Sequence, residues 1–79
     1  MKLFLITQEE NHEYDAYDSA VVAAPDEETA RQMDPGNGKP MSWGSEFWCS
    51  GPEHVNVKYL GIAVSSIKRS VICASFNPG

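Results

Sequence analysis

Residues 9–19, EENHEYDAYDS, hold the densest set of side chains with potential for chemistry. Five carboxylates, one histidine and two tyrosines fall within eleven positions, and no lysine or arginine lies among them. Carboxylate oxygens and imidazole nitrogens bind metals, and neighbouring carboxylates can transfer protons. The same side chains also suit a solvated turn or a contact with a basic surface. The spacing of the residues has to decide among these alternatives.

That spacing does not fit a metal site. A calcium-binding loop arranges its acidic ligands around an obligatory glycine, whereas residues 9–19 contain no glycine. Zinc requires closed sets of histidine and cysteine ligands. Cys49 and His54 lie five positions apart, and the sequence offers no obvious source for two further ligands. We therefore expect no metal and no other cofactor.

A catalytic site is equally hard to assemble from this sequence. A cysteine nucleophile would need a partner in His12 or His54 and a third group to orient that base. Cys73 lies within an apolar segment, VICA, which is typical of a small buried side chain. Carboxylates on an exposed turn are little desolvated, which leaves them poorly suited to proton transfer. There is no glycine-rich phosphate loop and no GxSxG motif, so we expect no catalytic residues and a protein that is not an enzyme.

Charge is distributed unevenly along the chain. Residues 1–53 contain all eleven acidic side chains and three basic ones, a net charge of −8. Residues 54–79 contain three basic side chains and no acidic one, a net charge of +3. With −5 overall, the protein is repelled by nucleic acids and anionic membranes and attracted to basic surfaces. We therefore expect no direct contact with nucleic acid.

Two further features bear on the compartment. The apolar start, residues 1–7, is too short for a signal peptide, and no apolar run reaches the roughly 18 residues of a membrane span. Cys49 and Cys73 are too few for a disulfide scaffold and lack CxxC spacing. We expect a cytoplasmic protein without membrane contact, whose two thiols are reduced and partly buried.

The chain is long enough for one domain, residues 1–79, and its pattern predicts the order β-β-α-β-β. The expected elements are strands in residues 2–8, 19–24, 54–64 and 69–76 and a helix in residues 25–33. In the first strand Phe4 and Ile6 face one way and the neighbouring leucines the other, which indicates a central strand or a partly covered edge strand. Pro25 suits the first turn of the helix. The fold class is therefore α+β, with one antiparallel sheet and a single helix on one face.

The links between these elements predict two hairpins. The acidic stretch forms the tip of the first hairpin, and the short link of residues 63–68 favours a second hairpin between the last two strands. The loop of residues 34–53 carries Trp43, Phe47 and Trp48. These aromatic side chains either pack on the sheet face that the helix leaves uncovered or contact a partner. Tyr14 and Tyr17 likewise either close one end of the core or contact a partner.

Four segments resemble a family of small proteins from bacteria, phages and prophages. They are YDAYDSAVVAA (residues 14–24), ETAR (28–31), VKYLG (57–61) and ASFNPG (74–79). Members of this family begin with a MKLYLLTQ-like strand, carry a YDxYDSAVVAA segment and end in ASFNAG or similar. Residues 34–53 and 65–70 differ from that pattern. In size, acidity and phage setting the family is similar to anti-CRISPR proteins against type I systems, type I-C included. The resemblance implies no catalytic residue.

What the resemblance implies agrees with the charge. A type I surveillance complex receives target DNA on surfaces rich in lysine and arginine, and a small acidic protein can occupy such a surface as a DNA mimic. We expect a monomeric inhibitor of this kind; the alternative is a non-catalytic interaction module or homodimer that makes contact through an edge strand or the aromatic loop. The expected partner-binding residues are Glu9, Glu10, Glu13, Tyr14, Asp15, Tyr17, Asp18, Glu27 and Glu28.

Overall fold

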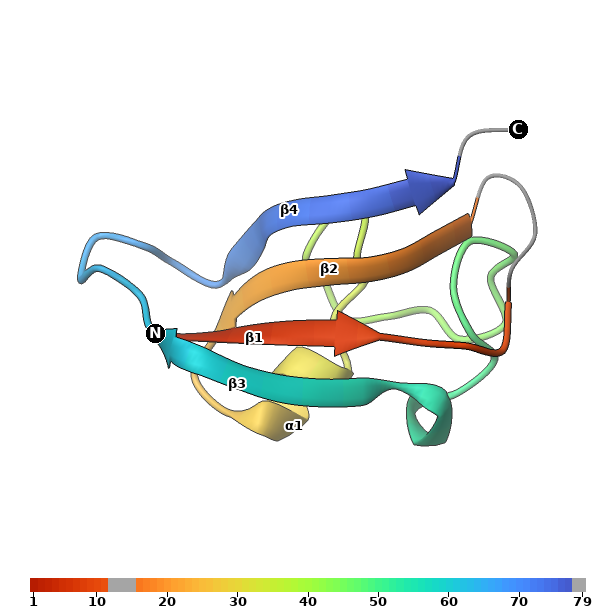
Figure 1. Cartoon of the computed structure of the whole chain (residues 1–79), viewed down its shortest axis with the longest axis horizontal. Coiled ribbons are helices and arrows are strands. Elements are labelled where there is room, and N and C mark those ends of the chain that lie inside the picture. The colour runs from red at the N-terminus through yellow and green to blue at the C-terminus, as the bar shows by residue number, and fades with distance from the viewer. Residues whose placement is uncertain (12–15, 78–79) are drawn as a thin grey trace.

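The computed structural model describes residues 1–11 and 16–77. Its elements are β1 (Lys2–Thr7), β2 (Ala16–Ala24), α1 (Glu27–Arg31), the 3-10 helix η1 (Pro52–His54), β3 (Asn56–Ile62) and β4 (Ser70–Asn77). The four strands form one antiparallel sheet in the order β3-β1-β2-β4 (Figure 1). The predicted α+β class, with one antiparallel sheet and one helix, is confirmed.

β1 is a central strand, which is one of the two positions that its apolar pattern indicates. It pairs with β2 on one side and with β3 on the other. Phe4 and Ile6 are buried in the core, whereas Leu3 and Leu5 are only partly buried on the opposite face. This alternation is the period-two pattern that distinguishes a sheet with one packed face. The predicted hairpin of the first two strands is also confirmed, because β2 follows β1 and pairs with it antiparallel.

The predicted hairpin of the last two strands is wrong. β3 and β4 lie at opposite edges of the sheet, with β1 and β2 between them. Three strand spacings of about 4.8 Å separate the two edges by roughly 14 Å, whereas the link of residues 63–69 can reach roughly 23 Å. A short link is therefore long enough to pass across the end of the sheet. β3 pairs with β1 and β4 pairs with β2, so that the two central strands, β1 and β2, each have a neighbour on both sides.

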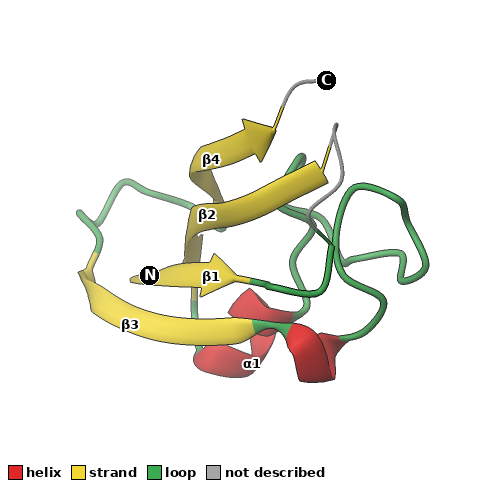
Figure 2. Cartoon of the chain, turned by 45° about the vertical axis from the view of Figure 1, so that its right-hand side comes forward, coloured by secondary structure: helices red, strands yellow, loops and turns green. Residues whose placement is uncertain are grey.

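α1 and the long loop, residues 32–55, lie on the same face of the sheet (Figure 2). Phe4 packs in one core cluster with Ala30 of α1 and with Trp48 and Cys49 of the long loop. The expectation that the loop aromatics cover the face left free by the helix is therefore wrong. A five-residue helix is only about 7.5 Å long, too short to cover four strands, so the loop completes the core on that side. The open face is the side of the sheet opposite α1.

The helix is shorter than predicted and begins after Pro25. Asp26 is its N-cap, and the Asp26 side chain accepts a hydrogen bond from the Thr29 backbone N–H at 2.7 Å. Pro25 therefore precedes the cap and does not belong to the first turn. At the other end Arg31 donates through Nη1 to the carbonyl oxygen of Val55, which ties α1 to the chain just before β3. Among the described residues no helix has the length and apolar character needed to cross a membrane.

The aromatic residues of the long loop divide between core and surface. Trp48 is 1% exposed, Trp43 is partly buried against the core, and Phe47 is 53% exposed. The two cysteines are both free and also differ. Cys49 is buried under the sheet, whereas Cys73 is exposed, so the prediction of a buried Cys73 is wrong. Cys73 pairs with Val21 and shares its face, and no described layer packs there.

Candidate binding surface

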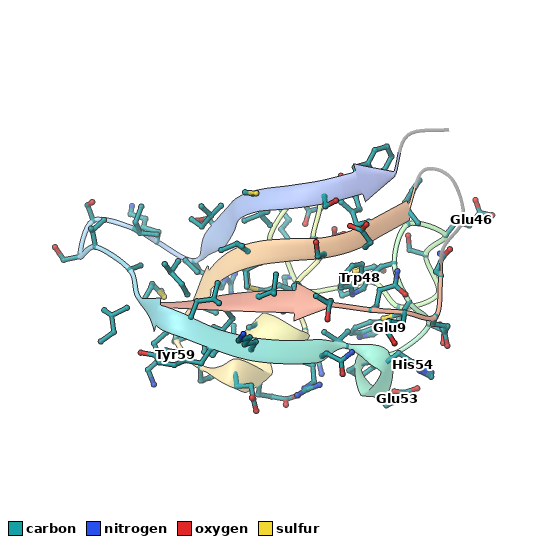
Figure 3. All side chains as sticks on the ribbon, viewed as in Figure 1. Glu9, Glu46, Trp48, Glu53, His54 and Tyr59 are labelled. Atoms are coloured by element: carbon teal, nitrogen blue, oxygen red, sulfur yellow. The ribbon has the colours of Figure 1, made fainter. Side chains whose placement is uncertain are left out.

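Carboxylates from four separate segments meet at the end of the sheet where β1 finishes and β2 begins (Figure 3). We call this region the acidic end; its members are Glu9, Glu10, Asp18, Glu46 and Glu53. In Figure 3 the labelled members Glu9, Glu46 and Glu53 lie at one end of the molecule, far from Tyr59 at the other. In the described part of the chain no lysine or arginine forms an ion pair with any of the five. The acidic end therefore presents carboxylates with no lysine or arginine paired to them in the described residues, and His54 is the basic side chain beside Glu10 and Glu53.

The Gln8 side chain shapes the turn from which the acidic end extends. Gln8 is 2% exposed and follows Phe4 and Ile6 on the inward face of the first strand. Its Nε2 donates to the backbone carbonyl oxygens of Asn11 at 2.7 Å and Tyr17 at 3.0 Å, and its Oε1 accepts from the Asn11 N–H at 2.7 Å. A buried amide with its polar atoms satisfied holds nearby backbone in one geometry. Gln8 thus fixes how the chain leaves β1.

Asn11 connects this turn to the long loop. Its Nδ2 donates to the carbonyl oxygen of Glu46 at 2.8 Å and to that of Trp48 at 3.2 Å. The loop therefore follows the turn closely, although more than thirty residues separate them in sequence. This contact brings Glu46 to the same end as Glu9 and Glu10.

Glu10 is held by the chain itself. Its carboxylate accepts from the Ser50 N–H at 2.6 Å and from the Ser50 hydroxyl at 3.0 Å, and His54 Nε2 lies 2.9 Å away. These hydrogen bonds from Ser50, with a smaller contribution from the charge of His54, hold the pKa of Glu10 below its ordinary value. His54 also lies 3.6 Å from the carboxylate of Glu53. Of the predicted partner-binding acids, Glu10 is thus engaged in a clamp that joins the β1 turn to the chain before β3.

The contacts of the Glu10 carboxylate should stabilise the fold less as pH falls. A carboxylate whose pKa is lowered by folding stabilises the folded state above its unfolded pKa, and this contribution is lost as pH falls through the lowered value. Glu10→Gln should therefore have a lower Tm than the wild-type protein at neutral pH, and the difference should shrink from about pH 6 to about pH 3. Thermal unfolding followed by circular dichroism measures this.

Glu9→Gln is the matched control for that experiment. Glu9 is exposed, and no hydrogen bond or ion pair to its side chain is found within residues 1–11 and 16–77. Its Tm should follow that of the wild-type protein at every pH. A pH-independent difference between Glu10→Gln and the wild-type protein would contradict the role given to the Glu10 carboxylate.

Glu27 and Glu28 lie elsewhere, on α1. Both form ion pairs with Arg31, at 4.0 and 3.8 Å. Glu27 also lines a shallow pocket with Lys2, and Glu28 lines another with Arg69. Lys2 begins β1, whereas the acidic end follows its last residue. The structure therefore does not join these two acids to the acidic end, and basic side chains lie beside both of them.

The remaining predicted residues have mixed outcomes. Asp18 is exposed at an irregularity of β2, and its backbone carbonyl accepts from the Gln8 N–H at 3.3 Å. Tyr17 is partly buried: it packs against the core, and its ring lies 4.8 Å from that of Phe76. Residues 13–15, which include Glu13, Tyr14 and Asp15, lie outside the described residues.

Sequence reasoning missed Glu46, Glu53 and Gln8. The two glutamates stand alone in a loop whose path is set by tertiary contacts, so no local pattern marks them. Gln8 did carry a signal, because it continues the inward alternation of Phe4 and Ile6 with a polar side chain. A polar residue in that register has to find buried partners, and the adjacent turn supplies them.

Among the described residues, the same region does not assemble a nucleophile. The Ser50 hydroxyl and the His54 imidazole both donate to the Glu10 carboxylate, whereas an activated serine donates to its imidazole. The Cys49 thiol donates to the Gly51 carbonyl at 3.4 Å, and burial raises the pKa of this thiol. Among the described residues no three histidine, cysteine or acidic side chains are arranged to hold a metal ion. The arrangement is suited to binding through charge.

Comparisons of the chain with protein-family models, curated proteins and solved structures gave no match.

Proposed function

We propose that the protein is a non-enzymatic inhibitor whose acidic end binds the basic, DNA-receiving surface of a type I CRISPR surveillance complex. The observation that carries this proposal is the clustering of Glu9, Asp18 and Glu46 beside Glu10 and Glu53, without a lysine or arginine ion-paired to them in the described part of the chain. The choice of target comes from the family resemblance of the sequence. The protein acts on another protein and does not itself contact nucleic acid.

The mechanism follows from electrostatics. A surface that receives DNA carries lysine and arginine side chains spaced to meet phosphates, and its counterions are released when DNA binds. A compact set of carboxylates fixed on a folded domain offers similar charge without the loss of chain entropy that a disordered acidic tail would incur. Once the acidic end occupies the surface, target DNA is excluded. Charge complementarity of this kind raises the association rate and is screened by salt.

A pair of matched charge reversals tests the site. Glu9→Lys/Glu46→Lys and Glu27→Lys/Glu28→Lys each change the formal net charge from −5 to −1, because each reversal adds two units. The first variant alters the acidic end and the second alters α1. We expect the first to weaken binding to a purified type I surveillance complex by about 10- to 100-fold, since lost attraction and new repulsion together amount to about 1–3 kcal/mol. The second should bind nearly as the wild-type protein does.

Binding is measured by the concentration of protein that prevents target DNA from shifting the complex on a native gel. If the two variants lost the same amount of affinity, net charge alone would determine binding. If neither variant lost affinity, binding through the acidic end would be contradicted. Circular dichroism shows whether each variant keeps its fold. For the wild-type protein, inhibition should weaken steeply from about 50 to about 200 mM salt.

A further inference from the structure

The outer edge of β4 is free and carries no charge. β4 is the last strand in the sheet order, and its eight residues, SVICASFN, include no charged residue and no proline. Within the described residues, the backbone of residues 72–76 makes no hydrogen bond other than those to β2. Exposed edges in folded proteins are usually protected by lysine, proline, bulges or a covering loop. Its pairing with β2 is irregular at two places, at Ile72 and opposite Asp18, but β4 itself has no lysine or proline, and no described loop pairs with residues 72–76.

The opposite edge of the sheet is protected. β3 carries Lys58 on its exposed open face, and its pairing with β1 shifts register between Leu3 and Phe4. Gly61, close to that shift, has a φ of 147°. A bulge of this kind twists a strand away from a straight edge and disfavours further pairing. Both edge strands carry a bulge, but only β3 also carries a lysine, so the uncharged edge of β4 is the less protected of the two.

An aromatic cavity of about 290 Å³ lies beside the last residues of this free edge. Its apolar lining comes from β2, β4 and the long loop, and consists of Tyr17, Pro35, Met41, Phe47, Trp48 and Phe76. Phe76 is 41% exposed and belongs both to β4 and to the cavity wall. Because cross-strand neighbours bring their Cβ atoms within about 5.5 Å, a strand added to β4 would place one side chain against Phe76. This volume lies just below the roughly 300–1,000 Å³ of small-molecule pockets, which suits a single large side chain.

Charge differs between the two ends of this edge. Asp34 lines the cavity, Asp18 and Glu46 adjoin its wall residues Tyr17 and Phe47, and all three are acidic. Residues 68–69, just before β4, are Lys and Arg. A strand that binds here is therefore favoured when its basic residues lie at the cavity end. The edge thus offers backbone pairing, one apolar site and an electrostatic direction.

We infer that the edge of β4 and the aromatic cavity together form a docking site for an extended segment of a basic partner protein. The segment adds to the sheet as a fifth strand, inserts one large apolar side chain beside Phe76 and places lysine or arginine next to that anchor. This inference rests on the proposed function in one respect, the basic character of the partner. The docking site lies at a sheet edge, and the acidic residues gave no sign of it.

A heptapeptide display library selected against the full-length chain tests the docking site. The enriched peptides, labelled with a fluorophore, are then titrated by fluorescence polarisation against the protein and its variants. We expect sequences of β-branched residues with one large apolar residue flanked by lysine or arginine. Ser75→Lys, which places a charge on the edge, and Phe76→Ala, which opens the cavity wall, should each weaken their binding by about tenfold or more.

Asn56→Lys is the matched control. Asn56 and Ser75 are exposed at the two ends of one cross-strand row, in which Thr7 and Ser19 lie between them. Both substitutions add one positive charge on the open face, but only Ser75→Lys alters the β4 edge. Binding by Asn56→Lys should equal that of the wild-type protein. Since Phe76→Ala also removes a ring contact with Tyr17, Ser75→Lys is the deciding variant if circular dichroism shows that Phe76→Ala is less folded.

Several outcomes would overturn the inference. The library could yield no peptide that binds, or peptides that bind Ser75→Lys as well as they bind the wild-type protein. Sedimentation could show a wild-type dimer that Ser75→Lys converts to a monomer, in which case a second copy of the chain occupies the edge. If Ser75→Lys still blocks DNA binding by the surveillance complex while Glu9→Lys/Glu46→Lys does not, the edge has no part in inhibition and the proposed function stands.

Discussion

Trp48→Ala should lower the free energy of unfolding by about 3–5 kcal/mol, the usual cost of emptying a buried aromatic site. Trp48 is the largest fully buried side chain and packs with residues of β1, β2 and α1 in a single core. A domain of this length has a total stability of roughly 4–12 kcal/mol, so a loss of this size removes a large part of it. The corresponding fall in Tm is roughly 15–30 °C. Urea unfolding followed by far-UV circular dichroism measures the effect without relying on tryptophan fluorescence.

Trp43→Ala is the natural comparison, because it removes the same ring from the same loop. Trp43 is only partly buried, and its Nε1 donates to Gln32 Oε1 at 3.2 Å. We expect Trp43→Ala to lower the free energy of unfolding clearly less than Trp48→Ala does. Trp48 Nε1, in contrast, is the one buried side-chain polar atom of the described residues that has no hydrogen-bond partner. Trp48→Phe removes that unpaired group and should therefore cost less than the loss of ring volume alone suggests. Equal losses for Trp48→Ala and Trp43→Ala would contradict the central place given to Trp48.

Gln8→Glu should be the most damaging near-isosteric change in the protein, at about 3–5 kcal/mol near neutral pH. The substitution replaces the Nε2 donor by a carboxylate oxygen that faces the carbonyl oxygens of Asn11 and Tyr17. Both donor bonds are lost, and an unpaired negative charge is placed at a site that is almost fully buried. Burial raises the pKa of the introduced carboxyl, so the penalty is largest above that raised value and is relieved as pH falls toward the unfolded pKa. The deficit of Glu10→Gln also shrinks as pH falls, but for a different reason, because there the carboxyl whose pKa folding lowers belongs to the wild-type protein and is absent from the variant.

Gln8→Met separates the charge from the lost hydrogen bonds. It keeps a side chain of similar length and removes all three bonds without adding charge. We expect a loss of about 1–3 kcal/mol that does not depend on pH. Urea unfolding of both variants at two pH values gives the comparison. A Gln8→Glu variant whose stability relative to Gln8→Met is the same at both pH values would show that the introduced carboxyl reaches solvent.

The sequence predicts local features of this fold well and pairing partners poorly. The alternation of Phe4 and Ile6 marks β1 as a two-faced strand, because side-chain direction in a strand depends only on local geometry. Whether β3 and β4 pair with each other or lie at opposite edges depends on tertiary packing. A link of seven residues, 63–69, is long enough for both arrangements. α1 likewise ends where long-range backbone contacts begin, because the Gln32 carbonyl accepts from the Met41 N–H and the Asp34 N–H donates to the Lys39 carbonyl.

The candidate surface shows the same division. The acidic stretch is visible in the sequence, and Glu9, Glu10 and Asp18 do lie at one end of the sheet. Glu46 and Glu53 reach that end through two long-range contacts that no local pattern encodes, that of Asn11 with the Glu46 carbonyl and that of His54 with Glu10. Glu27 and Glu28 are close to the stretch in sequence, yet the length of β2 carries the chain to the other end of the sheet before α1 begins.

The position of β1 also determines how the chain can assemble. β1 pairs with both β2 and β3, and β3, which begins at Asn56, is synthesised long after β1 ends at Thr7. The β1–β2 hairpin can form early, but one side of β1 then waits for β3 with its backbone groups unpaired. Closing such a long loop slows folding, because its entropy is lost before the contacts that compensate for it are made. During that interval the apolar segment LFLI lies at a temporary edge, where the nascent chain is most open to pairing with another copy of itself.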